Sequence, residues 1–561
     1  MQRIVLSFSR MENFKVIIFI LAVLISLSAL IDKLKLPYPV LLVLVGLIIG
    51  FVPVLPDLAL DPDVVFLVFL PPLLYDAASR TSWLDFKTNI RSISTLGISL
   101  VFFTTVIVAI TAYYLIPAFS WPMAFLLGAI ISPPDAIAAT GIIKGLGLNK
   151  KVISILEGES LVNDASALIA YRYALAASIT GSFVFWQAGI EFLLITGGGV
   201  IVGLIVGYVL IFIHKRIDNY PIVETSLTLL TPFLSYLLAE QVHASGILAV
   251  VSTGLFISWR SPEIFSYETR IQTRLVWDTL IFLLNGFIFI LIGLQLPGIL
   301  KQLPEYKFST LLGYGLLISL ATIFVRILWV FTSASLSRIF SPKNKNANNG
   351  DESADKDQAD TWKNVVIVAW TGTRGVISMA TALALPLALK NGKLFTQRPL
   401  ILFLCFVVIF VTLVVQGFSL PLLIRLLKVK PSVNEDKEEK ELQLYLDQST
   451  LHFIDHEFNP KPEPVIIKEL KLKYEQSAIK LVKEIGTHTR NERKTEQMPV
   501  RTLTPLQEAQ KEISRFQREL LLKLHKDGNF SDTAIRKVER DMDIDELKFN
   551  QLLPKENNKG N

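Results

Sequence analysis

The sequence predicts an all-α polytopic membrane protein of about 13 transmembrane helices, followed by a soluble helical tail. Two observations predict this fold class. Of the 561 residues, 51% are hydrophobic and the mean hydropathy is +0.48, which is more apolar surface than one soluble core can hide. The hydrophobic residues also come in runs long enough to cross a bilayer as helices. The net charge of +6 comes largely from loops between these runs, so it does not indicate nucleic-acid binding.

Thirteen apolar segments form the predicted transmembrane domain, residues 14–427, and we number these spans in chain order. The first run, Phe14–Leu30, lacks a small-residue cleavage site, so we expect a retained helix and not a cleaved signal peptide. The predicted spans are 14–31, 37–55, 63–79, 92–117, 121–143, 153–178, 186–213, 221–241, 244–258, 276–297, 309–337, 362–389 and 398–427.

The loops between the spans predict how the chain is oriented. Lysine or arginine follows spans 1, 3, 5, 7, 9 and 11, whereas the loops after spans 2, 4, 6 and 8 contain neither. Basic loops stay on the cytoplasmic side of a membrane. We therefore expect the N-terminus outside and the C-terminus in the cytoplasm, in the plasma (inner) membrane. The residues that depart from this rule are Arg3, Arg10, Lys301 and Lys307.

Two polar regions are predicted to lie in the cytoplasm. Residues 341–361 are low in complexity, which predicts a flexible loop. Residues 428–561 are rich in charges of both signs, and we interpret them as a soluble helical tail with an assembly or regulatory role. Apolar residues recur there at helical spacing over Val465–Ile485, Pro505–Leu524 and Ile535–Leu547.

Metal and disulfide chemistry find little support in the composition. Cys405 is the single cysteine, so no disulfide within the chain and no cysteine-based metal site is expected. His452 and His456 are one helical turn apart without a nearby third ligand, which favours a surface pair over a metal site. The sequence predicts no cofactor.

A double proline interrupts span 5, in the string Ser132-Pro133-Pro134-Asp135. Prolines remove backbone donors and block the helix, and the carbonyls they free need a cavity, water or a cation as partner. Pro134 lies roughly 20 Å along the span from Trp121, near the bilayer midplane. The alternative is a proline kink in which Asp135 caps the second half of the same helix.

Span 6 carries Glu159, Ser160, Asn163 and Asp164, and Asp164 lies roughly 16 Å deep. Ser160 and Asp164 are one helical turn apart, as are Glu159 and Asn163. Burial favours the protonated form of a carboxyl group and a nearby cation favours the ionised form, so proton and cation compete for one group. That competition is what cation/proton exchange requires. The alternative for Asp164 is a structural acid paired with a base.

Span 12 contains a second interruption, Gly372-Thr373-Arg374-Gly375, because two glycines weaken the helix around a charged residue. Its expected depth matches the break in span 5, and the two spans run in opposite directions. Paired broken helices in the two halves of a chain are typical of inverted-repeat transporters, with the site between them. Arg374 then offsets half-helix carbonyl dipoles, or an acid, when no cation is bound.

Two further intramembrane charges, Arg326 and Asp76, need partners or water. Arg326 in span 11 reaches the depth of Glu159, and we predict a structural ion pair between them, because a lone buried charge is costly. Arg374 is the competing partner for Glu159. Asp76, near the end of span 3, either lines the ion pathway or is a solvated acid at the membrane surface.

These residues favour a secondary transporter, and a monovalent-cation/proton antiporter above other kinds. A cation channel would line its pore with polar groups but would not need one carboxylate that alternates between ions. A proton-coupled transporter of another small solute is a further alternative. An intramembrane aspartyl protease is disfavoured, since no Gly-x-Gly-Asp span accompanies Tyr75-Asp76, and no other enzyme is indicated. A structural or receptor protein would not need paired broken helices.

Taken in order, the motifs resemble the bacterial cation:proton antiporter-1 family, the sodium/proton antiporters related to animal sodium/hydrogen exchangers. The resemblance covers about residues 14–427. It rests on FLPPLLYDA (69–77), SPPDAIAAT (132–140), EGESLVNDASAL (157–168), Arg326 and WTGTRG (370–375). The DGNFSDTAIRKVERDMDIDE region of the tail also looks like the cytoplasmic end of bacterial members.

The resemblance implies a homodimer in the lipid bilayer, with two inverted six-helix repeats arranged as a core domain and a dimerisation domain. It implies alternating access by movement of the core, and exchange of Na⁺, or else K⁺ or Li⁺, for H⁺ at Asp164. Ser160, Pro134 and Asp135 would add oxygen ligands, which suit hard cations. Asn163 stands where electrogenic relatives have a second aspartate, which implies electroneutral 1:1 exchange.

Two positions depart from the pattern of the family. Pro134 replaces a threonine that many relatives have before the aspartate, and Asp76 replaces a glutamate. Both differences bear on which cation is preferred.

Overall fold

The computed structural model describes twelve stretches of the chain, and the regular elements within them are helices. The predicted loop 341–361 and residues 136–140 of the span-5 motif lie outside the described residues. The described residues are 15–28, 37–52, 67–135, 150–180, 185–217, 220–340, 362–388, 395–427, 433–458, 464–486, 503–528 and 530–551.

The chain divides into two compact units. The first holds most of the apolar helices, and the second combines the tail with two short segments from earlier in the chain. The first unit is Met1–Asp218, Ile222–Trp259 and Thr273–Pro431; the second is Asn219–Pro221, Arg260–Gln272 and Ser432–Asn561.

The first unit contains helices that follow the predicted spans. Three of the helices, α12, α13 and α14, have residues that belong to the second unit. The helices are Lys15–Ser28, α2 (Tyr38–Gly50), α4 (Leu70–Arg80), α5 (Trp83–Thr88), α6 (Ile90–Ser94), the π-helical η1 (Thr95–Ser99), α7 (Leu100–Leu115), α8 (Trp121–Ile131), α10 (Lys150–Thr180), α11 (Phe185–His214), α12 (Pro221–Gln241), α13 (Gly246–Ile264), α14 (Tyr267–Lys301), α15 (Phe308–Phe340), a helix over 362–370, α17 (Val376–Leu383) and α18 (Arg398–Leu426).

Six helices within the described residues are long and apolar enough to cross a membrane, which confirms an all-helical membrane protein with several apolar spans. Shorter apolar helices accompany them. The total of thirteen spans and the two inverted repeats stay predictions. The six are Ile90–Leu115, Leu193–His214, Pro221–Gln241, Tyr267–Lys301, Phe308–Ser335 and Arg398–Leu426.

Three predicted spans differ from the helices that form. Helix α8 ends at Ile131, because Pro133 and Pro134 follow and cannot continue it. The predicted span 362–389 divides into the helix 362–370 and α17, with non-helical backbone over 371–375. Helix α14 begins at Tyr267 and not at residue 276, because its first turns are polar and hydropathy does not mark them.

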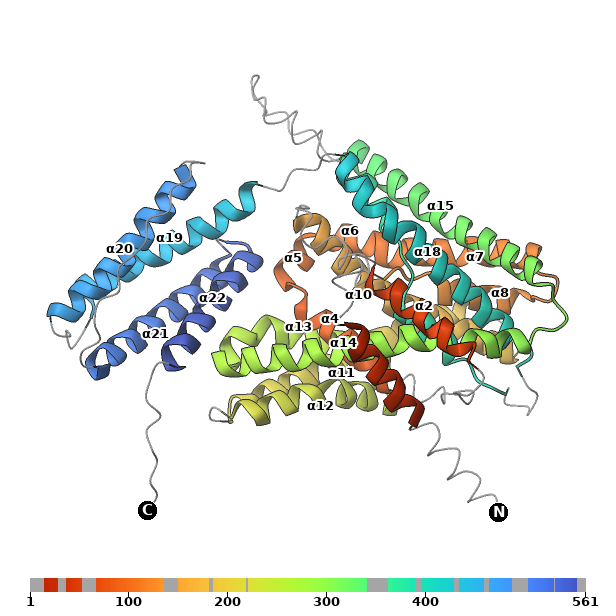
Figure 1. Ribbon diagram of the computed structural model, residues 1–561, viewed down its shortest axis with the longest axis horizontal. Coiled ribbons are helices and arrows are strands. Elements are labelled where there is room, and N and C mark those ends of the chain that lie inside the picture. The colour runs from red at the N-terminus through yellow and green to blue at the C-terminus, as the bar shows by residue number, and fades with distance from the viewer. Residues whose placement is uncertain are drawn as a thin grey trace, which may run out of the picture. The chain divides into compact units, whose positions relative to one another are not determined.

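Packing in the first unit brings the interrupted helices together. Helix α8 packs against α7 and α10, and α15 packs against α7 and α18, as Figure 1 shows for the α15–α18 pair. Gly128 allows the close approach of α8 to α7, since a Cβ there would lie 2.4 Å from the Thr105 carbonyl oxygen. An apolar cluster that includes Leu156, Val325 and Ile367 joins α10, α15 and the helix 362–370. The charged site residues are therefore carried by helices with a shared core.

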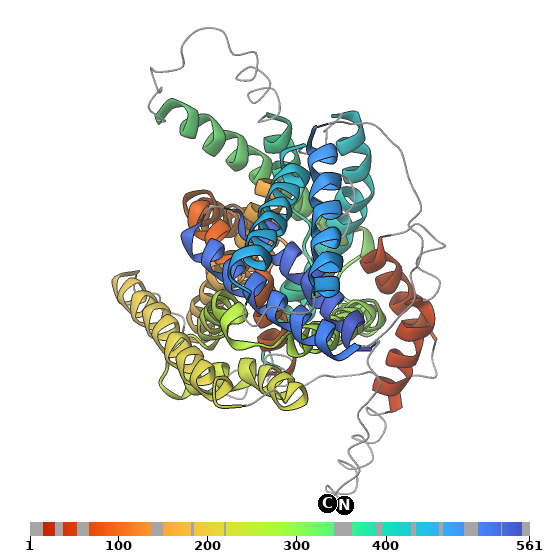
Figure 2. The same cartoon turned by 90° about the vertical axis from the view of Figure 1, so that its left-hand side faces the viewer.

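Among the described residues, the tail forms four helices of the second unit. Helices α19 (Val433–His456) and α20 (Pro464–Gly486) run side by side in Figures 1 and 2, and α21 (Leu503–Asp527) and α22 (Asp532–Gln551) contact α19. The three predicted tail helices correspond to α20, α21 and α22, whereas α19 was not predicted. Two apolar clusters hold them together, one around Leu442 and Ile535 and one around Phe458 and Ile513.

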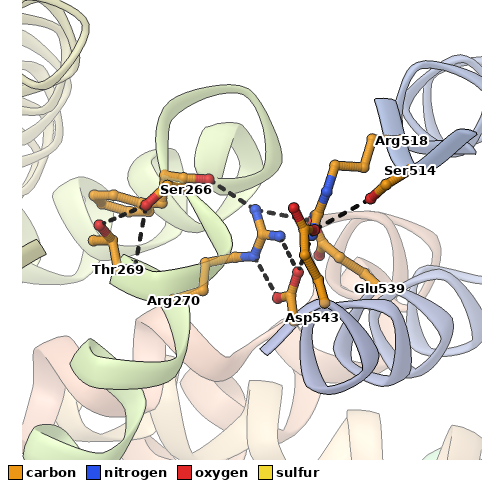
Figure 3. A network of polar contacts seen from close by, with 9 residues as sticks. Ser266, Thr269, Arg270, Ser514, Arg518, Glu539 and Asp543 are labelled. Carbon is orange, nitrogen blue, oxygen red and sulfur yellow. Dashed lines mark hydrogen bonds and ion pairs between the residues drawn. The ribbon is translucent and has the colours of Figure 1, made fainter. Parts of the chain in front are cut away.

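An arginine in the first turn of α14 ties the segment 260–272 to the tail helices of the same unit (Figure 3). Arg270 donates from Nε and Nη2 to the two carboxylate oxygens of Asp543, at 2.9 and 2.5 Å. It also donates from Nη1 to the Phe265 carbonyl oxygen at 2.8 Å. Arg518 binds Asp543 from the other side at 2.8 Å. The Asp543 side chain is 5% exposed, so this network lies inside the unit.

Candidate ion site

The two interrupted helices meet through their broken stretches. The Asp135 backbone N–H donates to the Thr373 carbonyl oxygen at 2.7 Å, and the Thr373 hydroxyl donates to the Asp135 carbonyl oxygen at 3.1 Å. The Val376 N–H donates to the Asp135 carboxylate at 3.3 Å. Asp135 thus supplies a negative charge at the N-terminus of α17, where a helix has unpaired N–H groups and a positive dipole end. In the sequence, Asp135 was considered as a cap for its own span; here it caps the other interrupted helix.

Helix α10 places its polar residues beside this crossing. The Asn163 side-chain amide donates to the Pro134 carbonyl oxygen at 3.3 Å, so one carbonyl at the proline break has a side-chain partner. Asn163 is fully buried, and Asp164 is 4% exposed. Ser160, one turn earlier, is partly buried. The structure therefore brings the acid of α10 to the two helix breaks.

A small cavity lies at this point. Its volume is about 20 Å³, which is room for about one water molecule or one ion without its hydration shell. Among the predicted site residues, Pro134, Asp135, Ser160 and Asp164 line it. The remaining walls come from α4, α14 and α17: Leu73, Leu74, Ala77, Asn285, Gly375, Val376, Ile377 and Ser378, together with Pro133 of the first break.

Glu159 and Arg326 form a bidentate ion pair next to the site. The distances are 2.5 Å from Nη1 to Oε1 and 2.9 Å from Nη2 to Oε2, and both residues are 1% exposed. Arg326 also donates from Nε to the Val368 carbonyl oxygen at 3.2 Å. The pair thus connects α10, α15 and the helix 362–370. A charge-assisted, bidentate geometry of this kind is what two buried charges need to be tolerated.

Arg374 lies in the second break and is also 1% exposed. Its backbone N–H donates to the Thr412 hydroxyl at 3.1 Å. Its Nε and Nη1 atoms have no hydrogen-bond partner within the part of the chain that the structure describes. Of the two arginines that the sequence offered to Glu159, the structure pairs Arg326 with it.

Asp76 is buried but does not line the cavity. Both of its carboxylate oxygens accept from Arg80 Nε at 2.8 Å, and Arg80 Nη2 binds Asp278 of α14 at 2.6 Å. Sequence reasoning did not predict this triad, although Arg80 follows Asp76 by one helical turn and could have suggested it. The cavity is lined instead by the neighbours of Asp76 on α4, among them Leu73 and Ala77.

Two cavity residues were missed as site candidates. Asn285 lies in the middle of the predicted span 276–297, and a polar residue at that depth was the available signal. Ser378 gave no signal, because a serine in a short apolar helix is common.

An all-helical membrane domain in which two interrupted helices meet at a buried carboxylate is typical of secondary transporters. The family model described as sodium/hydrogen exchanger, transmembrane, matches residues 18–426. The chain belongs to this family of transporters and is not an enzyme.

Several known proteins are similar to this chain. An uncharacterised Na⁺/H⁺ exchanger of Mycobacterium bovis is 30% identical over 559 residues, which cover 95% of this chain and 96% of the relative. A sodium, potassium, lithium and rubidium/H⁺ antiporter of Bacillus pumilus is 31% identical over 453 residues, 79% of this chain and 64% of the relative. Among solved structures, the sodium proton antiporter MjNhaP1 of Methanocaldococcus jannaschii matches with a TM-score of 0.59 at 22% identity, covering 74% of this chain and 99% of that one.

Proposed function

We propose that the protein exchanges Na⁺ for H⁺ across the plasma (inner) membrane, one for one, with both ions bound in turn by Asp164. The observation that carries this proposal is the burial of the Asp164 carboxylate in an ion-sized cavity where the two interrupted helices meet. The name of the Bacillus pumilus relative includes potassium and lithium, so K⁺ and Li⁺ are the alternative substrates.

In the proposed cycle, Asp164 is ionised when the cation is bound and protonated when it is absent. A neutral carboxyl group or a neutralised ion pair is cheaper to hold in a low-dielectric site than a bare carboxylate. The site is therefore occupied by one ion or the other whenever it changes sides, which couples the two fluxes. In this proposal two neutral oxygens bind the cation together with Asp164. One is Ser160 Oγ, and the other is the Pro134 carbonyl oxygen, which has a second lone pair besides the one that accepts from Asn163.

The stoichiometry follows from the neighbours of Asp164 under this proposal. Asn163 is neutral and its amide is engaged by Pro134. Asp135 is a second acid, but its carboxylate accepts the Val376 N–H at the N-terminus of α17, which stabilises its negative charge in either state. One carboxylate then gains and loses a proton in each cycle, and exchange is electroneutral.

The other charges have supporting roles in this proposal. The Glu159–Arg326 pair holds α10 against α15 and keeps the core rigid. Arg374 offsets the carbonyl ends of α8 and the helix 362–370 when the cation is absent. Asp76, with Arg80 and Asp278, lies on the cytoplasmic approach to the cavity. The core moves against the dimerisation domain of a homodimer, with the N-terminus outside and the tail in the cytoplasm.

The test uses purified protein in liposomes that contain a pH-sensitive dye. We expect NaCl added against a pH gradient to drive proton movement in the wild type and not in Asp164→Asn, which folds normally by size-exclusion chromatography. KCl and LiCl in parallel samples identify the preferred ion. Proton movement that is unchanged when the membrane potential is clamped supports electroneutral exchange. A folded wild type in which no cation moves protons, or an Asp164→Asn variant with normal exchange, would contradict the proposal.

A further inference from the structure

Two side chains that line the same cavity as Asp164 each carry a buried oxygen without a hydrogen-bond partner in the described part of the chain. They are Asn285, on α14, and Ser378, on α17. The Asn285 side-chain carbonyl oxygen and the Ser378 hydroxyl oxygen have no partner among the described residues. Asn285 is 7% exposed and Ser378 is 2% exposed, so water at the protein surface does not satisfy them.

An unpaired buried polar group is unfavourable, and each one in a native protein requires a reason. In the apolar helices of the first unit, buried hydroxyl groups commonly donate to a carbonyl oxygen of their own helix. Ser319 and Thr322 on α15 do so at 2.7 and 2.8 Å. Ser378 lies in the first turn of α17, where the carbonyl four residues earlier belongs to the break, and its hydroxyl has no partner among the described residues. Two orphan oxygens that share a cavity with a carboxylate indicate a positively charged ligand.

We propose that the side-chain oxygens of Asn285 and Ser378 are two further ligands of the transported cation, and that they set which cation is preferred. This inference rests on the proposed exchange at Asp164. Hard monovalent cations bind carboxylate, amide and hydroxyl oxygens. A cavity of about 20 Å³ excludes a hydrated ion, so oxygens of the protein must replace the water that the ion loses.

The positions of the two residues extend the site beyond the predicted elements. Asp164 and Ser160 belong to α10, Pro134 and Asp135 to the first break, and Ser378 to α17, so α10 and both interrupted helices contribute. Asn285 belongs to α14, which carries no other predicted ligand. A cation held by Asp164 and Asn285 together therefore bridges α10 and α14. If α10 moves relative to α14, the contact between the cation and Asn285 breaks. Cation binding by the complete set of ligands therefore requires the arrangement of α10 and α14 seen in this structure.

The ranking of ions follows from the same contacts. The number of coordinating dipoles and the space available to them decide how well Li⁺, Na⁺ or K⁺ compensates for its lost hydration. Removal of one oxygen leaves a partly dehydrated ion with too few ligands. The effect is greatest for the ion that the complete set fits best.

The experiment measures the half-saturating concentration of Na⁺, K⁺ and Li⁺ for proton movement in proteoliposomes at one fixed pH. The variants are Asn285→Ala and Ser378→Ala, with Asn285→Ser as a milder change should the alanine variant fail to fold. We expect the half-saturating concentration of the preferred ion to rise by about tenfold in each variant, as for the loss of one contact to a charged group. We also expect the ranking of the three ions to change.

Matched controls separate a ligand role from general effects of buried polarity. Ser319→Ala removes a buried hydroxyl that is satisfied by the Gly315 carbonyl, away from the cavity. Thr104→Val removes a fully buried hydroxyl that, like the proposed ligands, has no partner in the described part of the chain, but which does not line the cavity. Neither change should alter the half-saturating concentrations or the ranking.

The outcomes distinguish this inference from the proposed function. If Asp164→Asn abolishes exchange while Asn285 and Ser378 variants keep wild-type half-saturating concentrations and ranking, the two residues are not ligands and the exchange proposal stands. A maximal rate that falls equally for all ions, with unchanged half-saturating concentrations, assigns them a packing role and overturns the inference. If Asp164→Asn still exchanges ions, the proposed function itself is wrong.

Discussion

The carboxylate of Asp135 occupies the space that a side chain at position 375 would need. A Cβ on Gly375 would lie 1.7 Å from Asp135 Oδ2 and 2.6 Å from its Cγ. These two residues are far apart in the sequence, and their contact places the end of one interrupted helix on the start of the other. The glycine that the sequence suggested as a helix breaker therefore has a second purpose, which is close approach.

Gly375→Ala should displace Asp135 and impair ion exchange. The methyl group overlaps the carboxylate, so either the cap on α17 or the backbone at the break must move, at a cost of about 1–3 kcal/mol. We expect the maximal rate of cation-driven proton movement in liposomes to fall by roughly tenfold or more, as a displaced site residue typically causes. Gly313→Ala on α15 is the matched control, because a Cβ there has no neighbour within 4 Å. Normal exchange by Gly375→Ala would show that the cap is dispensable.

Removal of one member of the Glu159–Arg326 pair should destabilise the first unit. Each single change, Glu159→Gln or Arg326→Gln, leaves a buried charge without its partner. Such a change typically lowers the free energy of unfolding by about 3–5 kcal/mol. Unfolding of the detergent-solubilised protein, followed by tryptophan fluorescence, measures the loss. The double variant should be less destabilised than the sum of the two single variants, because no unpaired charge is left.

Arg172→Gln provides the comparison for that pair. Arg172 binds Glu240 at 2.6 Å, but the two side chains are 37% and 33% exposed. An ion pair that is this accessible to water should contribute only about 0–1 kcal/mol to the free energy of unfolding. Equal losses for Arg172→Gln and Arg326→Gln would mean that burial does not determine the importance of these pairs.

Arg270→Ala should loosen the segment 260–272 within the second unit. The substitution removes the contacts of Arg270 with Asp543 and with the Phe265 carbonyl. We expect amide hydrogen exchange in the first turns of α14 and in α22 to accelerate by about tenfold or more, as for lost hydrogen bonds to a charged partner. Arg515→Ala is the control, since that arginine is 81% exposed and pairs with Glu519 on its own helix. Unchanged exchange in Arg270→Ala would contradict the role of the network in Figure 3.

The tail should become less stable as pH rises through about 6. Burial raises the pKa of Asp447 on α19 to about 6, partly opposed by a hydrogen bond from Ser477 and by the charge of Lys473. Between the ordinary aspartate range and this value, the folded state holds a proton that the unfolded chain has lost. Stability is therefore greatest at the acidic end of this window, declines as pH rises through it, and stays at the lower level above it.

Hydrogen exchange of α19 at pH 5 and pH 7, corrected for the intrinsic rates, measures this effect in the full chain. Wild type should be more protected at pH 5, and Asp447→Asn should show little of this difference. Asp455→Asn, which changes a 43% exposed aspartate paired with Lys471, should behave as wild type. The same pH dependence in Asp447→Asn would assign it to other groups.

Much of the helical fold could be predicted from local patterns. Apolar runs marked the spans, and the prolines at 133 and 134 and the glycines around Arg374 marked the interruptions, because each of these features acts within one helix. The same patterns failed for the polar first turns of α14 and for α19, whose helical structure depends on packing inside the second unit. Hydropathy reports transfer into lipid, so it does not detect helices of that kind.

For the candidate site, residue type alone singled out the charges of Asp164, Asp135, Glu159 and Arg326, since a charge in an apolar run is costly wherever it falls. Which partner each charge has was decided by the tertiary structure. Asp135 caps α17, Arg80 binds Asp278, and Asn285 and Ser378 enter the cavity of Asp164, through contacts between segments far apart in the chain. Such contacts depend on the rotation and register of packed helices, which no single helix encodes.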